Sequence, residues 1–132
     1  MDDLIAAANA ARLAGAADGD AEARLGAGAR LFAYGTLRPG EPNHHVVAGI
    51  AGRWLPGTVA GTVWTCPAGS HAGLPALTLG AGLAEGMVLL SPALPAHWPR
   101  LDAFEGALYA RLLARVETPE GPFAANVYEF RG

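Results

Sequence analysis

Residues 30–40 read RLFAYGTLRPG, and this stretch decides the fold more than any other in the chain. Its first part, residues 31–34, is a short run of apolar and aromatic side chains, which is typical of a buried strand. Gly35, Pro39 and Gly40 follow, and these residue types end strands and form turns. A strand that ends so abruptly directs successive backbone N–H groups beyond its end. The segment therefore predicts a turn that binds an anion or an oxyanion.

Length and composition limit the class of protein. A chain of 132 residues fits one domain with a real core. The net charge is −3, and the nine basic residues, all of them arginine, form no long run, which argues against a nucleic-acid surface. The single cysteine, Cys66, can form no disulfide within the chain. The sequence lacks a membrane-spanning run and the pattern of a secretory signal, so we expect a cytoplasmic protein.

The remaining sequence predicts a helical extension followed by a β-rich domain. Residues 4–14 have high helix propensity, and residues 1–29 are interpreted as a helix and linker that precede a domain at residues 30–132. Further strands of the domain are expected at 54–68, 74–79, 84–90, 109–118 and 123–130, and Gly61 is expected to form a bulge or bend in the first of them. About two helical turns are expected within 42–51, and a helix is expected at 99–105, where Gly106 ends it. Several short strands with glycine bends predict a curved sheet or a barrel.

A second segment, residues 101–111, reads LDAFEGALYAR and carries the candidate catalytic group. Glu105 stands at the end of the expected helix, where it could face the turn at residues 30–40 or serve only as a charged helix end. Asp102 lies three residues earlier, on a similar helical face. A carboxylate pair is also typical of glycosidases, but nothing else in the sequence indicates a sugar cleft. Asp102 is therefore interpreted as a structural hydrogen-bonding residue.

The two segments together resemble the γ-glutamylcyclotransferase family. The resemblance rests on FAYGTLRPG, then LDAFEGALYAR and a late NVY, in this order and at this separation, and it covers roughly residues 30–130. It is strongest to the small branch that includes the γ-glutamylamine cyclotransferases. The resemblance implies an α+β fold, a small mixed β-barrel flanked by short helices. It also implies a substrate pocket between the loop after the first strand and the glutamate.

The resemblance assigns roles to individual residues as well. It makes Glu105 the catalytic acid/base, and it makes substrate-binding residues of Tyr34, Gly35, Thr36, Leu37 and Tyr109. Active members of the family release 5-oxoproline from a γ-glutamyl amine or γ-glutamyl amino acid by intramolecular aminolysis. We expect no cofactor and no metal, a small-molecule γ-glutamyl substrate as partner, no nucleic acid or membrane, and a monomer or homodimer.

Structural and non-catalytic alternatives to these roles stay open. The two tyrosines equally fit core aromatics with satisfied hydroxyls. The same fold and pocket could serve a non-catalytic binding or regulatory module. A pure binding pocket needs no proton shuttle, so Glu105 favours the enzyme, the more so if burial raises its pKa.

The histidines and the cysteine give weak support for a metal site. His44 and His45 are adjacent and cannot readily converge on one ion, and Cys66 with His71 makes a single loose pair. The default interpretation of Cys66 is a small, partly buried thiol. Arg111, just after Glu105 in the motif, is expected to make a structural ion pair.

Overall fold

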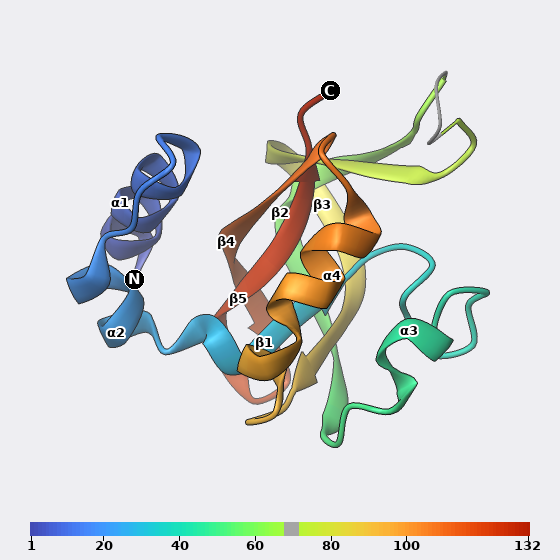
Figure 1. The fold of residues 1–132 in the computed structure, drawn as a ribbon, viewed down its shortest axis with the longest axis horizontal. Helices are drawn as coiled ribbons and strands as arrows, with labels where there is room; N and C mark the ends of the chain where they lie inside the picture. Colours follow the sequence, from blue (N-terminus) through green and yellow to red (C-terminus); the bar gives the residue numbers. More distant parts are fainter. Residues whose placement is uncertain (68–71) are drawn as a thin grey trace.

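The computed structural model describes residues 1–67 and 72–132, and these form a closed barrel of five strands with helices around it (Figure 1). The strands are β1 (Arg30–Ala33), β2 (Arg53–Thr65), β3 (Pro75–Leu90), β4 (Tyr109–Thr118) and β5 (Gly121–Phe130). They follow one another around the barrel in the order β1, β3, β2, β4, β5. All neighbours are antiparallel except β1 and β5, which run parallel. The predicted α+β fold with a small mixed barrel is confirmed.

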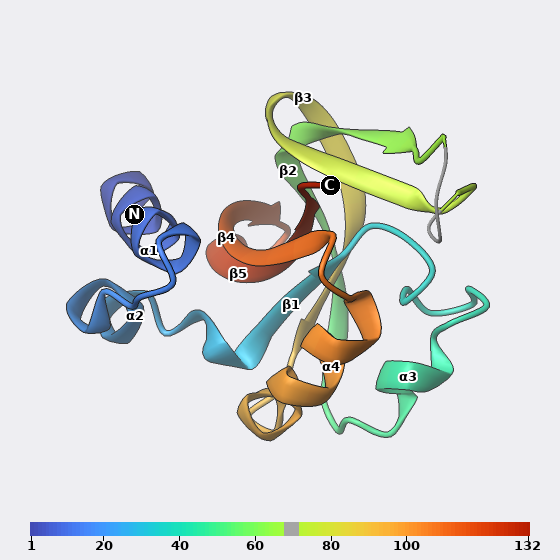
Figure 2. The same cartoon turned by 45° about the horizontal axis from the view of Figure 1, so that its top comes forward.

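Helices cover the barrel from several sides (Figures 1 and 2). Helix α1 (Asp2–Leu13) and helix α2 (Gly19–Leu25) lie together on one side, and α3 (His45–Ala48) lies on the other. Helix α4 (Trp98–Glu105) crosses β1, and two short 3-10 turns, η1 (Ala27–Ala29) and η3 (Leu94–His97), lead into β1 and α4. None of the helices in the described residues is long and apolar enough to cross a membrane.

Both faces of β1 are buried, as its apolar sequence predicts. Successive side chains of a strand point to opposite faces, so Leu31 and Ala33 pack with Leu101 of α4 while Phe32 points into the barrel. Complete burial of Phe32 stabilises the fold by about 2 to 3 kcal/mol relative to an exposed ring. The strand ends at Ala33. The loop that follows therefore begins between the two apolar clusters that pack on the two faces of β1.

β3 differs from the sequence prediction. Separate strands were expected at 74–79 and 84–90, but both belong to one strand, because β2 pairs antiparallel with both parts and the chain does not reverse between them. The glycines in between form a bulge instead of a turn. Gly82 has a φ of 105°, which favours glycine, and the register shifts between Ala60 and Gly61. The irregularity predicted at Gly61 is confirmed.

The predicted helix at 99–105 is confirmed as α4, and Gly106 ends it with a φ of 87°. The helix expected within 42–51 is shorter, since only the four residues of α3 are helical. Backbone turns occupy the residues before it, where His44 N donates to Glu41 O at 3.1 Å.

The extension contains a second helix, α2, that the sequence prediction missed. A loosened linker was expected there because of the alanine, glycine and aspartate content. Asp18 caps the helix by accepting a hydrogen bond from Ala21 N at 3.1 Å, and Gly26 ends it in the left-handed region at φ 58°. The cap at Asp18 and the stop at Gly26 favour a helix more strongly than the alanine, glycine and aspartate content favours a linker. The extension packs on β4 and β5 through an apolar cluster of Ala8, Ala21, Leu25, Ala27, Leu113 and Ala124.

Candidate active site

A cavity of about 260 Å³ opens beside the end of β1. Its lining comes from β1 and the loop after it, the end of α4, the residue before β3, and single residues of β3, β4 and β5: Leu31, Phe32, Ala33, Tyr34, Gly35, Thr36, Leu37, Asn43, Leu74, Pro75, Phe104, Glu105, Tyr109 and Tyr128. All six residues that the sequence predicts for the site therefore line one cavity. Their roles in binding and catalysis stay predictions.

Glu105 lines this cavity as the last residue of α4. Leu101, one turn earlier, is completely buried in the core and fixes the helix. Burial raises the pKa of Glu105 to about 7. The carboxyl also lies at the C-terminal end of the helix, where the helix dipole disfavours negative charge and acts in the same direction. A group with this pKa can both accept and donate a proton near neutral pH.

Two tyrosine hydroxyls lie within electrostatic reach of Glu105. Tyr34 donates a hydrogen bond from its hydroxyl to the Tyr128 backbone oxygen at 2.7 Å, and Tyr109 donates to the Pro75 backbone oxygen at 3.0 Å. Burial raises the pKa of both tyrosines, and the charge of Glu105 contributes to both increases. Both hydroxyls therefore stay protonated at neutral pH. They give the cavity fixed dipoles and no further negative charge.

The loop from Tyr34 to Leu37 is fixed by hydrogen bonds to the residues that follow it. Asn43 Nδ2 donates to Thr36 Oγ1 at 3.0 Å, and Asn43 N donates to Thr36 O at the same distance. Arg38 Nε donates to Gly35 O at 3.0 Å. The hydroxyl of Thr36 thus serves to hold the loop in shape, which fits the turn-stabilising role considered for it from the sequence.

Sequence reasoning missed two polar residues of the cavity, Asn43 and Tyr128. Tyr128 belongs to the late NVY segment, but its place depends on the parallel pairing of β5 with β1, where Leu31 is opposite Asn126. That pairing brings two distant strands together and leaves no local signal. Asn43 carried a signal, since an asparagine soon after a glycine turn is a candidate for holding that turn.

Asp102 does not line the cavity, although it lies one turn before Glu105. Its carboxylate accepts a hydrogen bond from the Tyr128 hydroxyl at 2.7 Å and another from Arg111 Nε at 2.9 Å. The predicted structural roles of Asp102 and Arg111 are confirmed. In the described lining Glu105 is the single carboxylate, so the cavity lacks the opposed pair on which glycosidases depend.

The candidate metal ligands do not come together in residues 1–67 and 72–132, where no three His, Cys, Asp or Glu side chains gather. His71 lies outside the described residues, so its pairing with Cys66 is not described. Cys66 itself is buried. His44 Nδ1 is 2.8 Å from the Leu37 backbone oxygen, and its ring contacts that of Trp54 at 5.6 Å between centroids.

The profile of the family described as "Gamma-glutamyl cyclotransferase, AIG2-like" matches residues 31–132. The chain belongs to this family. The match begins at the second residue of β1 and takes in the rest of the barrel, α4 and all lining residues of the cavity. The residues of the N-terminal extension lie outside it. No curated protein matches the chain.

Solved structures agree with the family membership. YkqA from Bacillus subtilis is 30% identical, with a TM-score of 0.61 over 77% of this chain, which spans about a third (35%) of the YkqA chain. An AIG2-like protein from Mus musculus is 26% identical, with a TM-score of 0.57 and 76% of each chain covered. A structure titled "Gamma-glutamyl cyclotransferase" is 17% identical, with a TM-score of 0.56 over 76% of this chain and 65% of that one, and it supports the fold alone.

Proposed function

We propose that this chain is a γ-glutamyl cyclotransferase that releases 5-oxoproline from a γ-glutamyl amine or γ-glutamyl amino acid by intramolecular aminolysis, with Glu105 as general acid/base. The observation that carries the proposal is a carboxyl with a pKa of about 7 in one small cavity with the loop at 34–37. Membership of the family supports the reaction class. We further propose that the reaction uses no cofactor, that its partner is a small molecule, and that the protein acts in the cytoplasm.

The first half of the reaction uses the α-amine of the substrate as nucleophile. At neutral pH this group is an ammonium, and it cannot attack until it loses a proton. Deprotonated Glu105 takes that proton as general base. The nitrogen lone pair then attacks the γ-carbonyl carbon, a C–N bond forms, and negative charge collects on the carbonyl oxygen.

In the second half, the bond from the γ-carbon to the leaving nitrogen breaks. The carbonyl re-forms as Glu105, now protonated, donates its proton to that nitrogen and returns to the carboxylate. The ring nitrogen still carries two hydrogens after the attack, and it gives its second proton to the same carboxylate, from which the released amine takes it up as an ammonium. The products are 5-oxoproline and a free amine or amino acid, and no water is consumed. A pKa near 7 suits both halves, because neither protonation state of the carboxyl is costly at neutral pH.

The cavity has mainly to fold the substrate, since nucleophile and electrophile belong to one molecule. Correct orientation in such reactions lowers the barrier by on the order of 7 kcal/mol or more. A cavity of about 260 Å³ is at the small end for ligand sites, which suits a γ-glutamyl group better than a long peptide. Backbone N–H groups of Gly35, Thr36 and Leu37 would hold the substrate carboxylate or the developing oxyanion.

Incubation with a panel of γ-glutamyl amines and γ-glutamyl dipeptides tests the proposal, with 5-oxoproline measured by mass spectrometry. We expect release from at least one class of substrate. Glu105→Gln keeps the side-chain shape and cannot carry a proton, so its turnover should fall by at least about 100-fold. If no substrate yields 5-oxoproline although calorimetry detects binding, the protein is a binding module instead of an enzyme.

Glu85→Gln is the matched control. Glu85 is an exposed residue of β3 outside the cavity lining, and the same substitution there should leave turnover unchanged. Full turnover by Glu105→Gln would overturn the acid/base assignment even where the activity itself exists.

A further inference from the structure

The outer edge of β4 is covered by helix α1 where a barrel strand would be expected. β4 pairs with β5 along its length, but its pairing with β2 is confined to Thr58 and Glu117. On the edge of β4 where β2 does not pair, the Leu113 N–H donates to Asn9 Oδ1 at 2.7 Å, and the Leu113 oxygen accepts from Asn9 Nδ2 at 2.8 Å. The Asn9 amide thus satisfies both backbone groups of Leu113, as a strand neighbour does.

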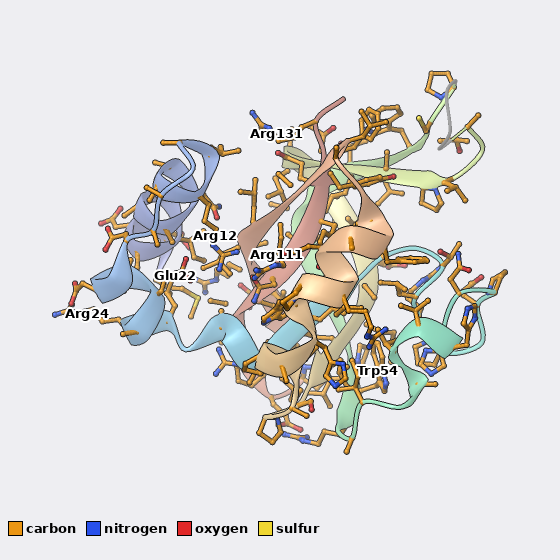
Figure 3. The ribbon with its side chains drawn as sticks, viewed as in Figure 1. Arg12, Glu22, Arg24, Trp54, Arg111 and Arg131 are labelled. Atoms are coloured by element: carbon orange, nitrogen blue, oxygen red, sulfur yellow. The ribbon has the colours of Figure 1, made fainter. Side chains whose placement is uncertain are left out.

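Arg12 continues this contact one turn further along α1. Its Nη1 donates to the Arg111 backbone oxygen at 3.0 Å and to Asn126 Oδ1 at 2.8 Å. Its Nε and Nη2 form a two-point pair with Glu22 of α2, each at 2.8 Å. The Arg12 side chain is only 17% exposed. Figure 3 shows Arg12 and Arg111 facing each other between the extension and the barrel, while Arg24 points away into solvent.

Asn126 connects Arg12 to Arg111. Its Oδ1 also accepts from Arg111 Nη1 at 2.9 Å, and its Nδ2 donates to the Ala27 backbone oxygen at 2.9 Å. Arg111 in turn binds Asp102, and its guanidinium lies 4.5 Å from the centre of the Trp98 ring. Both Asp102 and Trp98 belong to α4. The hydrogen bonds that begin in α1 therefore end on the helix that carries the candidate catalytic group.

Asp102 lies one turn before Glu105 and accepts, through its backbone oxygen, the hydrogen bond from Gly106 N that ends α4. Its side chain is held by Arg111 and by Tyr128, whose ring lines the cavity. α4 has eight residues, and no side chain caps its N-terminus. A helix so short has little stability of its own, so its last turn depends on anchors such as Asp102.

We propose that Arg12, from the N-terminal extension, is a positioning residue for Glu105, acting through Asn126, Arg111 and Asp102 on the last turn of α4. The inference rests on the proposed function, because the network is proposed to position Glu105 for its role as acid/base. It gives the extension a part in the site although no residue of the extension lines the cavity. Loss of Arg12 removes one donor from the Arg111 backbone oxygen and one from Asn126 Oδ1. The Arg111 side chain that holds Asp102 is then less firmly placed, and the last turn of α4 becomes more open to solvent.

The experiment compares Arg12→Gln with Arg24→Gln. Arg24 is the matched control because it belongs to the same extension, pairs with Asp20 and is 66% exposed. Two readouts are needed: kcat and KM over a range of pH, and the titration of the Glu105 carboxyl by ¹³C NMR. In the part of the chain that the structure describes, the titratable groups that interact with Glu105 include the hydroxyls of Tyr34, Tyr109 and Tyr128, and all three are protonated near neutral pH.

In Arg12→Gln we expect kcat to fall by about tenfold to a hundredfold with little change in KM. The Glu105 titration should move down by about half a pH unit or more, since the carboxyl gains solvent. Arg24→Gln should match the wild type in both readouts. A folded Arg12→Gln protein with wild-type kcat and wild-type Glu105 titration would overturn the proposal and leave Arg12 a purely structural role.

The NMR readout separates this inference from the proposed function. If the Glu105 titration moves in Arg12→Gln while Glu105→Gln keeps full turnover, the positioning of Glu105 stands and its role as acid/base fails. If Arg12→Gln does not fold, Arg12→Lys decides by the same readouts. Lysine keeps the charge but cannot donate to Glu22, Asn126 and Arg111 at once. A folded Arg12→Lys protein with unchanged kcat and titration would then overturn the proposal.

Discussion

Burial of Glu105 should be measurable in the stability of the protein before any substrate is known. Glu105→Gln replaces the carboxyl with an amide of nearly the same shape that does not titrate. In the folded protein the pKa of Glu105 is raised from 4.5 to about 7. Between these two pH values the folded state holds a proton that the unfolded chain has already released. The stability linked to this proton is fully present below pH 4.5 and is lost as the pH rises through 7.

The magnitude follows from the width of that pH interval. Each pH unit corresponds to about 1.36 kcal/mol, which gives roughly 3 kcal/mol between pH 4.5 and 7. Glu105 is only partly buried, and the access of solvent to its carboxyl reduces this to about 2 to 3 kcal/mol. We therefore expect the wild type to lose about 2 to 3 kcal/mol of unfolding free energy relative to Glu105→Gln as the pH rises from 4.5 to 8. Above pH 8 the difference should be constant.

Urea unfolding followed by tryptophan fluorescence, at a series of pH values, measures this difference. Wild type, Glu105→Gln and Glu85→Gln are compared, and Glu85→Gln should follow the wild-type curve because its carboxyl is on the exposed surface of β3. If the difference between wild type and Glu105→Gln does not change with pH, the carboxyl is solvated in the folded protein. The argument for a proton shuttle near neutral pH would then lose its physical basis.

Three further outcomes are expected. The rising limb of kcat/KM against pH should have its midpoint near 7, since the base form of Glu105 exists above its pKa, and a midpoint near 4.5 would contradict this. Asn9→Ala removes the partner of both backbone groups of Leu113, so it should cost about 1 to 3 kcal/mol of unfolding free energy and speed hydrogen exchange of the Leu113 amide. A Leu113 amide that stays protected would refute the contact between Asn9 and the edge of β4. Tyr128→Phe removes the donor to the half-exposed carboxylate of Asp102 and should cost about 1 to 2 kcal/mol in urea unfolding, and a loss below about 0.5 kcal/mol would show that Arg111 alone holds that carboxylate.

Local sequence signals were sufficient for the parts of the site that lie close together in the chain. The apolar run at 31–34 followed by glycine predicted a buried strand that ends in a tight loop. Leu101 and Gly106 bound the last turn of a helix, and they place Glu105 at its end. These features follow from residue type and spacing, which a single sequence displays.

Features that depend on pairing between distant segments could not be predicted in the same way. The residues 74–79 and 84–90 are one strand because β2 pairs with both, and a glycine-rich bulge has the same composition as a turn. Tyr128 reaches the cavity because β5 lies parallel to β1, a contact between segments almost a hundred residues apart. The composition of residues 19–25 did not predict helix α2, although Asp18 is a residue type that caps helices.

The extension shows why sequence boundaries and packing boundaries differ. The family match begins at residue 31, and the division of the chain into 1–29 and 30–132 stays a prediction. Contacts across that boundary nevertheless include two hydrogen bonds between Asn9 and Leu113 of β4 and the buried side chain of Arg12. Removing residues 1–29 would leave the backbone groups of Leu113 without their present partners and Arg111 without one end of its network. Since Arg111 holds α4, the cost of that removal would fall on the geometry of the cavity as well as on the edge of the barrel.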